Sequence, residues 1–101
     1  MNKHLGKIFV LGVEYNIYID ESVKEAGETN FMRYTINLSP EISGKYFEST
    51  LWHELSHAYQ HEAGLVDILP SKVQEMVAQT MSSFIMNTVI PMIESRPRKR
   101  T

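Results

Sequence analysis

The sequence predicts one α+β domain in which three strands precede two helices. Two observations lead to this prediction. Before Pro40, apolar and polar residues alternate, whereas from about residue 45 apolar residues recur every three to four positions. Alternation is typical of a strand with one buried face, and the longer spacing is typical of an amphipathic helix. The chain has 101 residues, of which 43% are hydrophobic, so we expect one core, with residues 1–94 as a single domain.

The charge of the chain is unevenly distributed. Its formal net charge is −2, but four of the last six residues are basic, which leaves −6 for the residues before them. These cations are Arg96, Arg98, Lys99 and Arg100. We expect residues 95–101 to form a disordered, solvated tail. An acidic body with so short a basic tail argues against a nucleic-acid partner.

Cysteine is absent, which excludes disulfides and thiolate metal ligands. This composition fits a reducing compartment, and we expect a cytoplasmic protein. No apolar run approaches the roughly 18 residues that a membrane span needs, and no apolar core of a signal peptide is apparent. We therefore expect no membrane association. The sequence gives no indication of an oligomeric state.

Residues 7–11 and 13–19 are predicted as two strands separated by Gly12. The second alternates most regularly, with Val13, Tyr15, Ile17 and Ile19 on one face. Residues 21–30 are polar and are predicted to be a loop. Alternation returns over residues 31–38, the third predicted strand, which ends before Pro40 because proline cannot continue a ladder. The three strands are expected to form an antiparallel or mixed sheet.

The first helix is expected from about residue 45 to a C-terminal stop at Gly64. The second is expected to begin at Pro70-Ser71, where Gln74 lies three residues after Ser71 in the pattern of a capping box. Pro91 predicts an end near Val89 or Ile90. This second helix carries an apolar stripe that consists of Val73, Val77, Thr80, Met81, Phe84 and Ile85.

Within the first predicted helix, residues 53–57 read HELSH, a complete HExxH motif. Residues four apart lie on one helical face, so His53 and His57 can bind one metal ion, at roughly 2.0–2.1 Å from each nitrogen for zinc. Glu54 lies on the flank of that face, where it can accept a proton from a metal-bound water. The motif therefore predicts a metal site with an adjacent base.

A catalytic zinc usually has three protein ligands, and Glu75 is the best candidate for the third. On the second helix it shares a side with Ala78 and Ser82, small residues that let two helices approach closely. This matches the gluzincin arrangement, in which a following helix presents a glutamate. Glu62 and Asp67 are rivals, but both lie in or near the connection between the helices, where a rigid ligand set is harder to build.

His61 is one further turn along the first helix, about 6 Å beyond His57. It arrives two residues too early for the metzincin arrangement. We expect it to face solvent or substrate, although a role as a ligand stays open.

The chain resembles the ImmA/IrrE-type metallopeptidases that are common in phages and mobile elements. The resemblance spans about residues 33–87 and rests on three segments: residues 34–38 (YTINL), 49–57 (STLWHELSH) and 75–78 (EMVA). It implies a minimal zincin with one Zn²⁺ per chain, held by the two histidines and Glu75, with Glu54 as the general base. It also implies that the strand around Ile36 and Asn37 is an edge strand with which an extended substrate pairs.

Two classes of function follow from this resemblance. The first is a zinc endopeptidase of the host cell cytoplasm, phage-encoded, that cleaves a narrow protein substrate. The second is a non-catalytic interaction protein of phage origin that is stabilised by its metal. An intact Glu54 favours the first class, and the shortness of the chain favours the second. Tyr59 is the candidate for stabilising the oxyanion, with Tyr46 as an alternative, and each is also a possible packing residue.

Overall fold

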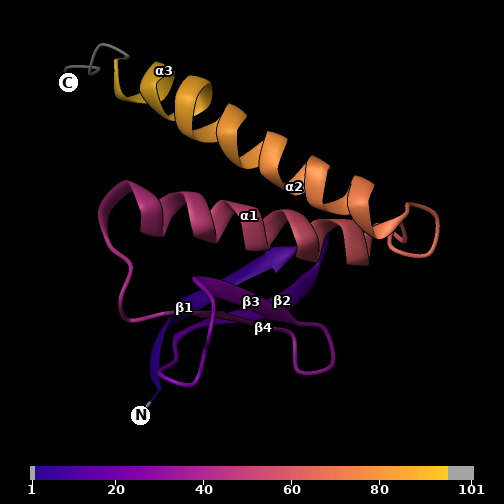
Figure 1. Ribbon diagram of the computed structural model, residues 1–101, viewed down its shortest axis with the longest axis horizontal. Coiled ribbons are helices and arrows are strands. Elements are labelled where there is room, and N and C mark those ends of the chain that lie inside the picture. Colours follow the sequence, from indigo (N-terminus) through magenta and orange to yellow (C-terminus); the bar gives the residue numbers. More distant parts are fainter. Residues whose placement is uncertain (1, 96–101) are drawn as a thin grey trace.

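The computed structural model describes residues 2–95 and has three layers (Figure 1). A four-stranded sheet forms one outer layer, and α1 (Gly44–Glu62) lies on one face of it. A second helical segment covers the other side of α1. It consists of α2 (Ser71–Phe84), a π-helical turn, η1 (Ile85–Val89), and α3 (Ile90–Glu94). The predicted α+β class is confirmed. Apart from Ser95, the predicted tail lies outside the described residues.

The first two strands form an antiparallel hairpin. β1 (Lys3–Val10) pairs with β2 (Val13–Ile19), so β1 begins four residues earlier than expected. Only Leu11 and Gly12 connect the strands, with φ angles of 48° and 84°. Two consecutive residues with positive φ are the geometry of a tight turn whose twist matches that of a hairpin, and glycine adopts it without strain.

The sheet has four strands where three were expected. The additional strand is β3 (Gly27–Asn30), which falls within the segment predicted to be a loop. It pairs antiparallel with β4 (Thr35–Leu38), and β4 in turn lies parallel to β2. The sheet is therefore mixed, in the order β1-β2-β4-β3. β3 carries no apolar alternation, and its place in the sheet comes from backbone pairing.

The strand that was expected at the edge is internal, and this part of the prediction is wrong. Ile36 pairs with Ile17 of β2 on one side and with Thr29 of β3 on the other. Ile36 is also fully buried, and Asn37 pairs with both neighbouring strands in the same way. No peptide can add to β4, because both of its edges are already hydrogen-bonded. The edge strand on this side of the sheet is β3.

The core lies between the sheet and α1. Tyr15, Ile36 and Leu38 are fully buried on the sheet face that α1 covers. Leu55 and Ala58 of α1 complete this buried cluster. The HExxH motif occupies the same turns of α1, so packing of its apolar face against the sheet fixes the direction in which the motif points.

α2 begins at the expected position, but the expected capping box does not form. Pro70 takes the N-cap position, and Ser71 is already helical, with no side-chain cap. The Gln74 side-chain amide donates instead to the carbonyl oxygens of Val66 and Leu69, at 3.0 and 2.7 Å. The side-chain amide of Gln74 therefore bonds to carbonyl groups of the loop between the two helices and does not cap the start of α2. These two bonds stabilise the loop.

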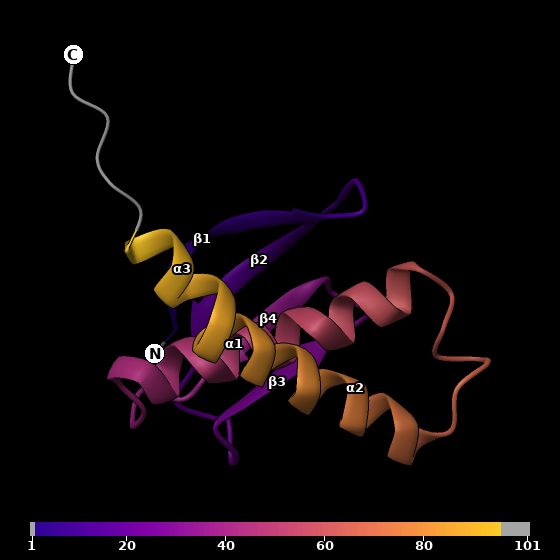
Figure 2. The ribbon, with the colours of Figure 1, turned by 90° about the horizontal axis from the view of Figure 1, so that it is seen from above.

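The second helix does not end before Pro91, as was expected. It continues through η1 and α3 as one helical segment, Ser71–Glu94 (Figures 1 and 2). The Ile90 N–H donates to the Ile85 carbonyl, five residues earlier. A proline within a regular α-helix clashes with the carbonyl four residues before it, and a wider π-helical turn relieves such a conflict. By length and composition alone, this segment could cross a membrane.

Candidate metal centre

The two histidines of the motif lie side by side on α1, on the face that looks toward α2. Their ring centroids are 5.0 Å apart, and the rings are tilted by 64°. Each side chain is about four-fifths shielded from solvent, with 22% of His53 and 18% of His57 exposed. The spacing of four residues therefore does what the sequence predicted: it brings two imidazoles to one place.

α2 presents Glu75 to this pair. Its carboxylate oxygens lie 2.5 Å from Nε2 of His57 and 3.5 Å from Nε2 of His53. One ligand atom from each of the three residues falls within 4.8 Å of the others, so the group could hold a metal ion. Among the described residues, no other group of histidine and acidic side chains meets this criterion.

The donor set and its spacing fit a metal ion. Tetrahedral donors at about 2.0–2.1 Å from zinc are roughly 3.3–3.4 Å apart. The two distances from Glu75 to the histidines, each measured from a different carboxylate oxygen, lie on either side of this value. Glu75 is 62% exposed, so the site opens to solvent on the α2 side. Two imidazoles and one carboxylate are a donor set that proteins use to bind zinc.

Small residues allow the close approach of α2 to α1, as the sequence predicted. Ala78 and Ser82 are buried on the side of α2 that carries Glu75. The Ser82 hydroxyl donates to the carbonyl of Ser49 at 2.7 Å. One turn beyond His57, the buried Gln60 donates through Nε2 to the carbonyl of Gln74 at 3.2 Å. These two bonds hold α2 to α1 on both sides of the metal candidates along the helix.

Glu54 lies beside the three candidates but takes no part in the cluster. The residue is only 9% exposed, and its Oε1 accepts a hydrogen bond of 2.8 Å from the hydroxyl of Thr29. The same hydroxyl lies 3.1 Å from the backbone oxygen of Glu54. A buried carboxylate is costly unless it is hydrogen-bonded. The bond from Thr29, on edge strand β3, therefore fixes the carboxylate in one orientation.

β3 reaches α1 because residue 27 is glycine. A Cβ atom at Gly27 would lie 2.9 Å from Cγ2 of Thr50, 3.0 Å from Cδ2 of Leu38 and 3.3 Å from Cγ of Glu54. A real Cβ does not tolerate the shorter of these contacts. The absence of a side chain therefore allows the strand that carries Thr29 to lie against the helix that carries Glu54. The sequence analysis did not identify Gly27 or Thr29, since both fell within a predicted loop.

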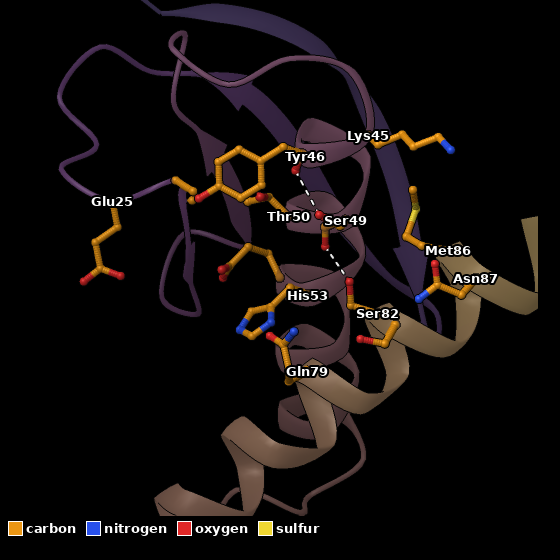
Figure 3. Close-up of a pocket in the computed structure, with 14 residues that line it drawn as sticks. Glu25, Lys45, Tyr46, Ser49, Thr50, His53, Gln79, Ser82, Met86 and Asn87 are labelled. Carbon is orange, nitrogen blue, oxygen red and sulfur yellow. Dashed lines mark hydrogen bonds between the residues drawn. The ribbon is translucent and has the colours of Figure 1, made fainter.

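A groove of about 550 Å³ extends from His53 and Glu54 along the N-terminal half of α1 (Figure 3). It lies between three segments: α1, the helical segment above it, and the chain that leads into β3. The helices diverge toward α3, which opens the space (Figure 1). Its lining residues are mostly polar: Glu25, Ala26, Gly27, Lys45, Tyr46, Ser49, Thr50, His53, Glu54, Gln79, Ser82, Ser83, Met86 and Asn87.

The rival ligands have other partners or positions. His61 stacks on Phe31, with ring centroids 4.4 Å apart. Glu62 accepts a hydrogen bond of 2.6 Å from the hydroxyl of Tyr15. Burial is the main cause that raises the pKa of Tyr15 above its usual range. The hydrogen bond to Glu62 and the negative charge of Glu62 raise this pKa further. Asp67 is exposed in the connection and does not belong to the cluster.

The tyrosine expected to stabilise the oxyanion is not at the site. Tyr59 follows His57 by two residues on α1, which places it about 200° further around the helix. It is 49% exposed and does not line the groove. Tyr46 does line the groove, and its ring lies near the N-terminal end of α1 (Figure 3).

Comparison of the chain with protein-family models, with curated proteins and with solved structures found no match. The fold and the site together define an α+β domain in which three side chains could hold a metal ion. Its function has to be inferred from these residues.

Proposed function

We propose that this protein is a zinc-dependent endopeptidase with a minimal zincin fold, similar to the ImmA/IrrE-type metallopeptidases. The observation that carries the proposal is the position of Glu54. A buried carboxylate, oriented by Thr29, lies next to three side chains that could hold a metal, and Glu54 and His53 line one groove. A structural metal site does not need a base beside it, whereas hydrolysis does.

In this proposal His53, His57 and Glu75 hold one Zn²⁺. When bound, zinc polarises the scissile carbonyl and makes water acidic enough to ionise near neutral pH. Glu54 accepts the proton of the attacking water as the oxygen–carbon bond forms. It then delivers this proton to the amide nitrogen as the carbon–nitrogen bond breaks. The bond from Thr29 engages Oε1, which leaves the second carboxylate oxygen of Glu54 for proton transfer.

The substrate in this proposal is an extended protein segment that enters the groove. Within the described chain, β3 has a strand partner on one side only. Its free edge borders the groove, because Gly27 lines it and Thr29 bonds to Glu54. A peptide that pairs with β3 would pass directly beside the metal candidates. This assigns to β3 the role that the sequence analysis gave to Ile36 and Asn37.

A second candidate function is a non-catalytic interaction protein that a bound metal stabilises. The observation that favours it is the position of Tyr59, which lies on another side of α1 and leaves the oxyanion without the expected donor. The intact, oriented Glu54 weighs more strongly, and we therefore keep the peptidase as the main proposal.

The test compares wild-type protein with Glu54→Gln in a cell lysate, with new peptide N-termini identified by mass spectrometry. Glu48→Gln, the same change at an exposed position of α1, is the matched control. We expect new N-termini with wild type and Glu48→Gln. Loss of the base should slow hydrolysis by about 10²–10⁴-fold while metal content and fold are retained. Equal cleavage by Glu54→Gln would refute the mechanism. A biological effect that survives the substitution would favour the interaction protein.

A further inference from the structure

Gln60 is a buried glutamine on the side of α1 that meets α2. It follows His57 by three residues and His53 by seven, so the three side chains leave the helix on one face. Only 1% of Gln60 is exposed, which makes it one of the largest fully buried side chains of the described chain. Glutamine is seldom buried so completely, because an apolar residue packs at such a position at lower cost.

The side-chain amide of Gln60 is only partly paired. Its Nε2 donates to the carbonyl oxygen of Gln74 at 3.2 Å, and Oγ of Ser56 lies 3.5 Å from the same nitrogen, at the limit of a hydrogen bond. Its Oε1 has no hydrogen-bond partner among the described residues. A buried acceptor without a partner lowers stability. Stability alone therefore does not explain this glutamine, and the contribution of the amide lies in the bond that Nε2 makes.

This bond reaches α2 at the residue next to the third metal candidate, since Gln74 directly precedes Glu75. The side chain of Glu75 is 62% exposed, and within the described chain its carboxylate pairs with His53 and His57 only. Little packing fixes so exposed a side chain. Its position therefore depends on where the backbone of α2 places it, and Gln60 bonds to that backbone from the helix that carries both histidines.

A second bond between the helices offers a comparison. The hydroxyl of Ser82 donates to the carbonyl oxygen of Ser49 at 2.7 Å. Ser82 follows Glu75 by seven residues, which is about 10 Å along α2. This bond also holds α2 to α1, but it lies two turns from the metal candidates. If Gln60 only joined the helices, loss of either bond would change metal binding to a similar extent.

We propose that Gln60 is a positioning residue for the metal, because its bond to the Gln74 carbonyl sets the distance between Glu75 and the two histidines. This inference rests on the metal-binding part of the proposed function and does not require hydrolysis. Groups that orient ligands without touching the ion typically contribute about 10–100-fold to metal affinity. The carbonyl of Gln74 also accepts the regular helical bond from Ala78, so it stays paired when Gln60 is replaced.

The experiment measures the zinc affinity of full-length Gln60→Met by competition with a chromophoric chelator. Methionine has a similar length, but it cannot donate to Gln74. We expect the dissociation constant for zinc to rise by about 10–100-fold. The chelated variant should unfold at nearly the same denaturant concentration as chelated wild type, since the unpaired Oε1 is removed as well. With Co²⁺ in place of zinc, the visible absorption at saturation should change, because it reports coordination geometry and not stability.

Ser82→Ala is the matched control, because it removes the other bond between the helices. It should lower stability and keep zinc affinity within about twofold of wild type. Gln60→Asn keeps the amide but is one methylene shorter, so it should weaken zinc binding as Gln60→Met does, and it replaces that variant if methionine prevents folding.

The inference is overturned if the Gln60 variants keep the zinc affinity or the Co²⁺ spectrum of wild type. It is equally overturned if Ser82→Ala weakens zinc binding as much as they do. Either result leaves the three metal candidates and the proposed peptidase in place. A wild-type protein that does not bind zinc would overturn both this inference and the proposed function.

Discussion

Gly27→Ala introduces one methyl group at the point where the edge strand meets the motif helix. The new Cβ would lie 2.9 Å from a methyl carbon of Thr50 and 3.0 Å from one of Leu38. A real Cβ atom does not make a contact of 2.9 Å, so the Thr50 side chain, β3 or α1 must move. A movement of β3 away from α1 would also lengthen the hydrogen bond of 2.8 Å between Thr29 and Glu54.

The expected cost can be estimated from two opposing effects. Adding a methyl group to a well-packed site typically costs about 1–3 kcal/mol. Replacing glycine with alanine at a position of ordinary φ reduces the entropy of the unfolded chain, which raises the free energy of unfolding by about 0.4–1 kcal/mol. We therefore expect the free energy of unfolding to fall by roughly 1–2 kcal/mol.

The assay is denaturant unfolding followed by circular dichroism, with Gly6→Ala as the control. Gly6 is also a strand glycine, but a Cβ there would meet no atom within 4 Å. We expect the control to change stability by less than about 0.5 kcal/mol in the destabilising direction. Peptidase activity, measured on the substrates found with wild type, should fall in Gly27→Ala, because Glu54 loses its orientation, while metal binding should not change.

Two results would refute this reasoning. If Gly27→Ala is as stable as Gly6→Ala, the close packing of β3 on α1 does not exist in solution. If Gly27→Ala loses stability but keeps full activity on those substrates, Thr29 does not orient the base.

Three further predictions concern the metal and the buried tyrosine. Elemental mass spectrometry of purified protein should find close to one zinc per chain. His57→Ala and Glu75→Ala should lose zinc or bind it more weakly. If His61→Ala loses zinc to the same extent, the assignment of the three ligands is wrong. Chelation should lower the melting temperature, because metal binding contributes several kcal/mol to small domains by linkage; an unchanged melting curve after verified removal would mean that the core is stable alone. Tyr15→Phe should cost about 1.5–3 kcal/mol in denaturant unfolding, since the tyrosine donates to the carboxylate of Glu62. Because folding raises the pKa of Tyr15, its contribution is complete below about pH 10 and is lost as the pH rises further, so wild type should lose more stability than Tyr15→Phe in that range.

Those parts of the site that depend on local helical geometry could be predicted from the sequence. Spacing alone placed His53 and His57 together. The small residues Ala78 and Ser82 indicated which side of the second helix approaches the first, and hence where Glu75 would point. The structure agrees with each of these because a helix relates residues three to four apart by fixed geometry.

The parts that depend on pairing between distant segments could not be predicted. β3 has a sequence, GETN, without apolar alternation, and it becomes a strand only by pairing with β4 and packing on α1. Its insertion at the edge made β4 internal, which no pattern within residues 31–38 could indicate. The helix end predicted at Pro91 is wrong for a related reason. The π-helical turn η1 accommodates the proline ring, so the helix continues through α3.

Residues 53–75 contain all three metal candidates, so the helical hairpin of α1 and α2 supplies the complete ligand set without the sheet. The sheet contributes Thr29, which acts on Glu54 and not on any ligand candidate. In the proposed peptidase, affinity for the metal and alignment of the base therefore depend on different layers of the molecule. If the proposed mechanism holds, substitutions in β3 would change hydrolysis without removing the metal, and changes between the helices would alter the choice of metal without moving the base. In the proposed peptidase, changes in one edge strand would be enough to turn the enzyme into a metal-stabilised binding protein.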